Sequence, residues 1–386
     1  MRNLFSKILN RLPLRNFILF ESIPVYSDNT KYVFDELVNR GYNRKYKMYW
    51  VLRPNENYDA TLFNNLSNVY FLPETIISNS KIKKILHYLK FTYVVHVAKV
   101  YVSCNRIQTK FRPTQYCINL AHGEALKNCR DYYTLPDEVD EVCCLSPFLA
   151  KYDAINFNCD TSKMLPLGYA RNDLLFGEKT DLKKIFYSKE FNKAIYWLPT
   201  YRQHRNGKIS SSDVSFPIIY NDKIAQKINK SARENDVIII IKPHPAQDLS
   251  LIKNMNLSNL VFIDNDYLRT NSIENYELLR SVDAMITDYS SVYYDYLLCD
   301  KPIALCFDDF EEFNSNQGFT VDPNMILKAG EKIYNDDDLC EFIVRISNNE
   351  DILKNERAKI IDICHLHKDN NSTKRIVDRI VDNLEE

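Results

Sequence analysis

The sequence predicts an α/β protein of two domains, each built on a parallel sheet. From residue 17 onward, short runs of β-branched and aromatic residues alternate with helical patterns, as in successive βαβ units. The chain also has 386 residues, which exceeds one ordinary core at roughly 150 residues per domain. We therefore expect two α/β domains.

Ten segments are expected to be strands, and they form two series. They are 17–20, 47–52, 99–103, 117–121 and 141–145, followed by 194–198, 237–241, 260–263, 284–287 and 303–307. Residues 238–241 are all isoleucine, as expected of a strand buried on both faces. Between the series, residues 168–181 hold few apolar side chains, which places the domain boundary near residue 175.

Composition excludes several classes of protein. A formal net charge of -1 gives no bulk attraction for nucleic acid. The ten cysteines contain no CxxC pair, which argues against a disulfide framework or a structural zinc site. The apolar stretch at the N-terminus is too short for a signal peptide, and no run of about 18 apolar residues is present. We expect a cytoplasmic protein, in solution or on a membrane surface.

Two segments combine basic and apolar residues at helical spacing. Residues 1–15 place Leu4, Phe5, Ile8, Leu9 and Leu12 on one face, with Arg2, Lys7, Arg11 and Arg15 mostly elsewhere. Residues 81–90 combine Lys81, Lys83, Lys84 and Lys90 with Ile82, Ile85, Leu86 and Leu89. Such helices either dock on the core or attach to an anionic membrane, and charge patterning alone leaves both readings open.

In the second half, apolar strands end directly in polar residues able to hold an anion. These residues are Thr200 and Arg202, then Lys242 and His244, then Asp288, Ser290 and Ser291. Ligands bind at the carboxyl ends of parallel strands, and a helix start with serine hydroxyls attracts phosphate. Asp288 or Ser290 would serve equally as a plain helix cap. The three strand ends together indicate a diphosphate site.

The first half has two further candidate loops. His122 and Gly123 follow the strand 117–121, with Lys127 one helical turn later. Arg171 and Asp173 follow Gly168 in another turn. A structural His-Gly turn and a solvated loop are the alternatives for these two segments.

Taken in order, these motifs resemble those of the CDP-glycerol glycerophosphotransferase family. The matching segments are 21–22 with 28–29, 122–123 with 127, 168 with 171–173, 199–200 with 202, 242–245, 286–291 and 301–302. The resemblance covers about residues 17–380 and implies a GT-B-like fold, with two Rossmann-like domains facing a central cleft. It implies an acceptor-side domain over 1–175, including the basic amphipathic N-terminus, and a CDP-donor-binding domain over 176–386.

The resemblance implies transfer of glycerol phosphate, or a related polyol phosphate, from CDP-glycerol to a surface polymer with release of CMP. His122 is then the candidate general base, and His244 is a second catalytic candidate on the donor phosphates. Donor-binding candidates are Arg202, Thr200, Lys242, Asp288, Ser290, Ser291 and Ser372, and acceptor-side or cleft candidates are Lys127, Arg171 and Asp173. Implied partners are a CDP-polyol, a lipid-linked or polymer acceptor and the inner face of the cell membrane.

Departures from the family pattern leave alternatives open. Glu124 stands where the family usually has threonine, and it could hydrogen-bond His122. One alternative is a GT-B glycosyltransferase using a UDP- or CMP-sugar, and another is a non-catalytic nucleotide-binding subunit of a polymer-export complex. No cofactor is required. Residues 264–266 form either an Asx-rich turn or a DxD element, so a divalent metal stays open.

Overall fold

The chain divides into two compact units. The structure is a computed structural model that describes residues 8–105, 109–131, 134–200, 216–243, 255 and 257–385. Unit 1 comprises Met1–Glu124, Tyr132–Asp173 and Asp369–Glu386. Unit 2 comprises Ala125–Asp131 and Leu174–Lys368. The main division lies close to residue 175. In addition, the final helix belongs to unit 1, and a short segment after Glu124 belongs to unit 2.

Unit 1 is built on seven parallel strands in the order β3-β2-β1-β4-β5-β6-β7. Their bounds are β1 (Arg15–Glu21), β2 (Lys47–Leu52), β3 (Val69–Pro73), β4 (Ala98–Ser103), β5 (Tyr116–Asn119), β6 (Glu141–Cys143) and β7 (Met164–Leu165). The central strands are the ones that the sequence predicts. The edge strands β3 and β7 were not predicted, because β7 has only two residues and the five-residue β3 ends in proline, which weakens a strand signal.

One predicted boundary is wrong for a reason that bears on function. The strand expected over 117–121 ends at Asn119, since Ala121 has a φ of +52°, which a strand does not accommodate. The chain turns there and presents the carbonyl groups of Leu120 and Ala121 to the Asn29 side chain. His122 follows directly from this turn.

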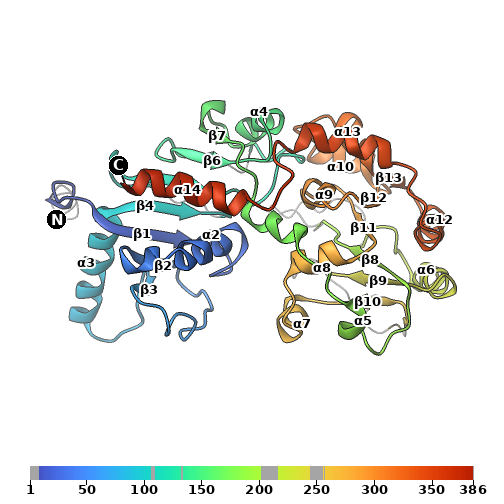
Figure 1. Cartoon of the computed structure of the whole chain (residues 1–386), viewed down its shortest axis with the longest axis horizontal. Helices are drawn as coiled ribbons and strands as arrows, with labels where there is room; N and C mark the ends of the chain where they lie inside the picture. Colours follow the sequence, from blue (N-terminus) through green and yellow to red (C-terminus); the bar gives the residue numbers. More distant parts are fainter. Residues whose placement is uncertain are drawn as a thin grey trace. The chain divides into compact units, whose positions relative to one another are not determined.

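Helices of unit 1 pack through apolar faces. They are α2 (Asp28–Asn39), η1 (Tyr42–Arg44), α3 (Lys81–Val97), α4 (Pro147–Asn156), η2 (Thr161–Lys163), η3 (Ala170–Phe176, which runs into unit 2) and α14 (Ser372–Glu385). Ile376, Val377 and Ile380 form the buried face of α14, at helical spacing. This helix, red in Figure 1, packs against α2 and β4.

Unit 2 is built on six parallel strands in the order β10-β9-β8-β11-β12-β13. Their bounds are β8 (Lys193–Trp197), β9 (Val237–Ile241), β10 (Leu260–Phe262), β11 (Ala284–Thr287), β12 (Ile303–Cys306) and β13 (Glu331–Ile333). Every residue of β9 is buried, as its isoleucine run predicts. The edge strand β13 was not predicted.

The helices of unit 2 cover this sheet. They are α5 (Leu182–Ile185), α6 (Asp222–Glu234), α7 (Asn265–Thr270), α8 (Asn275–Ser281), α9 (Val292–Leu297), α10 (Phe310–Asn316), α11 (Pro323–Ile326), η4 (Leu327–Ala329), α12 (Asp336–Ser347) and α13 (Lys354–Cys364). Residues of α6 and α12 pack with the sheet in one hydrophobic cluster. The expectation of two parallel-sheet units is thus confirmed.

The described segments also bear on membrane insertion and on the state of the cysteines. Within the described ranges, no helix has both the length and the apolar character needed to cross a bilayer. All ten cysteines lie in described segments and are free thiols.

Candidate functional site

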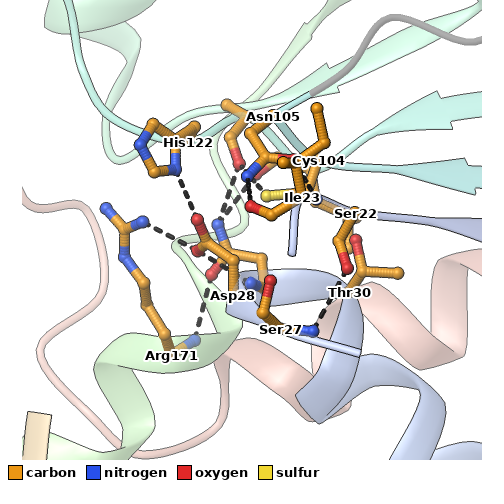
Figure 2. Close-up of polar contacts among 12 residues, drawn as sticks. Ser22, Ile23, Ser27, Asp28, Thr30, Cys104, Asn105, His122 and Arg171 are labelled. Atoms are coloured by element: carbon orange, nitrogen blue, oxygen red, sulfur yellow. Dashed lines mark hydrogen bonds and ion pairs between the residues drawn. The ribbon is translucent and has the colours of Figure 1, made fainter. Parts of the chain in front are cut away.

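In unit 1, three segments far apart in the sequence meet around one carboxylate. Asp28 lies at the start of α2, and its Oδ2 is hydrogen-bonded to Nδ1 of His122. Its Oδ1 accepts a hydrogen bond of 2.8 Å from Nη1 of Arg171. Figure 2 shows the imidazole and the guanidinium reaching Asp28 from two sides. The His122 side chain is 66% exposed, whereas that of Asp28 is 10% exposed, so a buried anion holds a solvent-facing imidazole.

Asn29 ties the backbone of this site together. Its Nδ2 donates to the Leu120 and Ala121 carbonyl groups at 3.2 and 3.0 Å. Its Oδ1 accepts a hydrogen bond of 3.1 Å from the Arg171 amide. Because Asn29 is buried, these bonds are shielded from water and fix the other two segments relative to Asp28.

The electrostatics assign the protons of the site. Burial raises the pKa of Asp28, but attraction to Arg171 and hydrogen bonding to His122 outweigh it and hold that pKa well below its usual value. Asp28 is therefore ionised at neutral pH and can only accept hydrogen bonds. In neutral His122 the proton must then lie on Nδ1, which leaves the lone pair on Nε2.

The same corner contains three side chains of types that can bind a metal ion. Ligand atoms of Asp28, Cys104 and His122 lie within 4.8 Å of one another. However, the Arg171 guanidinium already neutralises Asp28, and burial raises the pKa of the Cys104 thiol well above its usual value. This donor set therefore fits proton handling better than cation binding.

Glu124 does not hold His122, contrary to the expectation from sequence. It is buried, and its Oε1 accepts a hydrogen bond of 2.6 Å from the Leu145 amide. Burial raises the pKa of Glu124 well above its usual value, and the nearby Asp153 carboxylate raises it further. Asp28 is thus the carboxylate partner of His122.

In unit 2, several predicted donor-binding residues lie at one edge of the sheet. Thr200 follows β8, Lys242 follows β9, and Ser290 follows β11, and these three strands are neighbours. Their carboxyl ends share one edge because the strands are parallel. Burial lowers the pKa of Lys242, and the Asp264 carboxylate opposes that shift.

Asp288 has a supporting position in this edge. It is buried and accepts two hydrogen bonds from the Thr200 amide, at 3.1 and 2.9 Å, and another from the Thr200 hydroxyl. These bonds join the loop after β8 to the loop after β11. Asp288 can therefore position Thr200, whereas a buried carboxylate has no means of attracting a phosphate.

The two serines remain candidates for ligand contact. Ser291 is the N-cap residue of α9, but its side chain makes no capping hydrogen bond. Ser290 and Ser291 are both half-buried. The alternative that these serines serve simply as helix caps is thereby weakened.

Other predicted residues lie elsewhere. Arg202 and His244 fall outside the described residues. The main chain of Lys127, in unit 2, forms a bridge to Phe319. Asp173 and Ser372 meet in unit 1, where the Asp173 carboxylate accepts hydrogen bonds of 2.9 and 2.8 Å from the Ser372 and Thr373 amides.

That contact caps the start of α14 and gives both residues a structural role. Asp264 likewise caps α7, where it accepts a hydrogen bond of 2.8 Å from the Tyr267 amide.

Sequence reasoning did not assign a role to Asp28. The segment 28–29 belonged to the family motifs, but its partners lie 94 and 143 residues away. A positive φ of 55° at Asp28 marks an unusual turn that is not visible in the sequence.

Comparison with known proteins gives a family match over nearly the whole chain. Residues 4–382 match the family described as CDP-glycerol:poly(glycerophosphate) glycerophosphotransferase. The ribitol-phosphate polymerase TarL of Staphylococcus aureus is 22% identical over 94% of the chain, which spans 62% of that relative's length. A poly(glycerol phosphate) polymerase of Bacillus spizizenii is 24% identical, with 97% of the chain and 94% of the relative covered.

A solved structure shares the fold. A variant of the wall teichoic acid polymerase TagF superposes with a TM-score of 0.70 at 20% identity, covering 100% of the chain and 93% of that structure. The GT-B-like fold class expected from the sequence is confirmed by this likeness.

The buried Glu124 carboxyl predicts a pH-dependent stability. Because its pKa is raised in the folded state, its contribution is complete below its unfolded value of 4.5 and is lost as pH rises through the folded pKa. Glu124→Gln, which cannot ionise, should therefore raise the melting temperature relative to wild type, and by more at pH 8 than at pH 5. The exposed Glu190→Gln is the matched control. An equal effect at both pH values would contradict the raised pKa.

Proposed function

The chain belongs to the CDP-glycerol:poly(glycerophosphate) glycerophosphotransferase family, and from this premise we propose that it transfers a polyol phosphate from a CDP-activated donor to a polymer acceptor. Glycerol phosphate is the proposed transferred group, and CMP is the proposed leaving product. The observation that carries the proposal is the exposed His122 imidazole held by an ionised, buried Asp28.

The reaction proposed is an in-line displacement at the β-phosphorus of the donor. The acceptor hydroxyl gives its proton to Nε2 of His122 as its oxygen bonds to phosphorus. The bond from that phosphorus to the bridging oxygen breaks, and CMP leaves with the electron pair. Asp28 orients the imidazole and stabilises the imidazolium that forms, while Arg171 keeps Asp28 ionised.

The donor phosphates are assigned to unit 2. Ser290 and Ser291 offer hydroxyl donors, Thr200 is held in place by Asp288, and Lys242 adds a cationic group at the neighbouring strand end. Arg202 and His244 are proposed to complete this set, on the family resemblance alone. Unit 1, which bears His122, then receives the acceptor.

Membrane attachment is proposed through α3. Ile82, Ile85, Leu86 and Leu89 follow one another at helical spacing, and their exposed fractions run from 37% at Leu89 to 69% at Ile82. Lys81, Lys83, Lys84 and Lys90 on the same helix are exposed. An apolar stripe flanked by lysines fits an anionic bilayer surface, which favours a lipid-linked acceptor on the cytoplasmic face.

The experiment that tests the proposed activity is a panel of CDP-, UDP- and CMP-activated donors, with released nucleotide as the readout. We expect CMP from CDP-glycerol or a related CDP-polyol. Release of UMP or UDP from a UDP-sugar would replace the proposal with a glycosyltransferase. No release from any donor, with nucleotide binding intact, would favour a non-catalytic subunit.

His122→Ala should lower kcat by about 10²- to 10⁴-fold, because a general base contributes that much, while Kd for CDP-glycerol changes little. Asp28→Asn should also lower kcat and displace the pH–rate profile, since the imidazole loses its anionic partner. Asp35→Asn on the same helix is the control and should keep wild-type kcat. The base assignment fails if His122→Ala retains kcat within about threefold, or loses activity only through donor affinity.

Ser290→Ala combined with Ser291→Ala should weaken CDP-glycerol binding about tenfold or more for each hydroxyl that contacts a phosphate. A hydrogen bond to a charged group contributes about 1.5–3 kcal/mol, and 1.4 kcal/mol corresponds to tenfold. Calorimetry measures Kd, and Ser347→Ala is the control. Unchanged affinity in a folded double variant would leave the serines a structural role only.

Ile85→Ser combined with Leu86→Ser should reduce flotation with anionic vesicles, because the apolar stripe of α3 is interrupted. Higher salt should reduce it further. The exposed Ile352→Ser in unit 2 provides the matched control. Deleting residues 1–15 tests the other basic segment, at the N-terminus, in the same assay. Flotation equal to wild type in the α3 variant would exclude α3 as an anchor.

A further inference from the structure

Unit 2 contains a pocket that none of the roles above uses. It has a volume of about 610 Å³ and lies where β12 and β13 end, beside the segment that precedes α6. Ligand sites commonly have volumes of roughly 300–1,000 Å³, so this pocket can hold a small molecule. A single three-carbon glycerol unit would fill only a part of it.

The polar lining of the pocket is acidic. Asp308, Asp309, Glu311 and Glu312 come from one loop and the start of α10, against one lysine, Lys332. The Nζ of Lys332 lies 5.0 Å from the centre of the Phe307 ring. An excess of carboxylates repels phosphate and accepts hydrogen bonds, so the pocket suits a neutral ligand rich in donors, such as hydroxyl groups.

Besides Pro217 and Asn324, the remaining lining is aromatic. Phe307 and Phe310 stack with ring centroids 4.7 Å apart. Tyr220 and Tyr334 also line the pocket, and both are exposed. These rings offer apolar contact surface for the C–H groups of a carbon chain. The combination of acceptors and rings matches a molecule that carries both hydroxyl groups and C–H surface.

Asp308 adds an unsatisfied acceptor. Its Oδ2 accepts hydrogen bonds from the Ile218 amide, at 3.0 Å, and from the Tyr220 hydroxyl. Its Oδ1 is buried and has no hydrogen-bond partner among the described residues. Leaving such an acceptor unpaired is unfavourable, and a hydroxyl donor that reached the loop would relieve this.

The pocket is joined to the serine loop. β12 pairs with β11, and Tyr289, which precedes Ser290, donates a hydrogen bond of 3.0 Å to Asp309. The Tyr289 ring also contacts Phe307, Phe310 and Phe313. A ligand whose phosphate reaches the serines could therefore place a neighbouring neutral group in the pocket.

We propose that this acidic, aromatic pocket binds the polyol part of a substrate, and that its size accepts a polyol longer than glycerol. The inference rests on the proposed function for the source of the polyol, which is either the donor or the end of the acceptor chain. Carboxylates of the pocket accept the polyol hydroxyls, and the rings pack on its carbon chain.

The test uses Glu311→Gln combined with Tyr334→Ala, two exposed positions whose change should leave the fold intact. Glu190→Gln combined with Tyr187→Ala, also exposed and in unit 2, is the matched control. Saturation-transfer NMR with free glycerol and ribitol should give signals in wild type and control, stronger for ribitol. In the pocket variant, the polyol signals should be at least threefold weaker than in wild type.

Calorimetry and kinetics then show whether the donor or the acceptor supplies the polyol that the pocket binds. If the donor supplies the polyol, the pocket variant should bind CDP-glycerol and CDP-ribitol at least fivefold more weakly, with CDP unchanged. If the acceptor supplies it, donor affinities stay constant and KM for a polyol-phosphate oligomer rises. Either result supports the pocket.

Equal weakening of CDP and CDP-polyols would overturn the proposal in favour of a nucleoside pocket. Absence of polyol signals in wild type would also overturn it. Because the NMR arm needs no nucleotide, polyol signals in a protein that releases no CMP would refute the proposed function alone.

Discussion

Parallel pairing is the constraint from which both candidate sites follow. In each sheet all strands run the same way, so every carboxyl end lies at one edge. In unit 1 this edge carries the turn after β1 that leads to Asp28 and the turn after β5 that leads to His122. In unit 2 it carries the loops that contain Thr200, Ser290 and Asp308. The helices that connect successive strands cover the sheet and bury its interior strands. Polar backbone groups in the loops at the carboxyl ends of these strands then need side-chain hydrogen-bond partners.

Two buried carboxyl groups of unit 1 show how partners decide ionisation. Burial alone raises the pKa of both Asp28 and Glu124. Arg171 and His122 reverse that effect at Asp28, whereas Asp153 reinforces it at Glu124. The ionised group can orient and stabilise a cationic imidazole, and the group with the raised pKa can support the loop by accepting from the Leu145 amide. Similar burial therefore yields one carboxylate that stays ionised and one carboxyl group whose pKa is raised.

Much of the fold was predictable because interior strands are buried and therefore consist mostly of apolar residues. The isoleucine run of β9 is the clearest example, and β1, β2, β4, β8 and β11 were also located within a few residues. The edge strands β3, β7 and β13 were missed, because β7 and β13 have only two and three residues and β3 ends in proline. The pairing of Asp28 with His122 and Arg171 depends on contacts across 94 and 143 residues, and the pairing of Asp173 with Ser372 spans 199. No local pattern encodes such distances, so the residues were identifiable but their partners were not.

Neighbouring strand ends of unit 2 offer opposite chemistry, and this limits how a ligand can lie on them. The loop after β11 offers serine hydroxyl donors, and the loop after β12 and the start of α10 together offer four carboxylates. A phosphate placed against those carboxylates would meet repulsion of about 1–4 kcal/mol per close charge pair, for an effective dielectric constant between bulk water and the protein surface. A neutral polyol placed at the serines would leave the acceptors unused. On the proposed function, we infer that a molecule with an anionic and a hydroxylated part lies with its phosphate at Ser290 and its carbon chain towards β12 and β13.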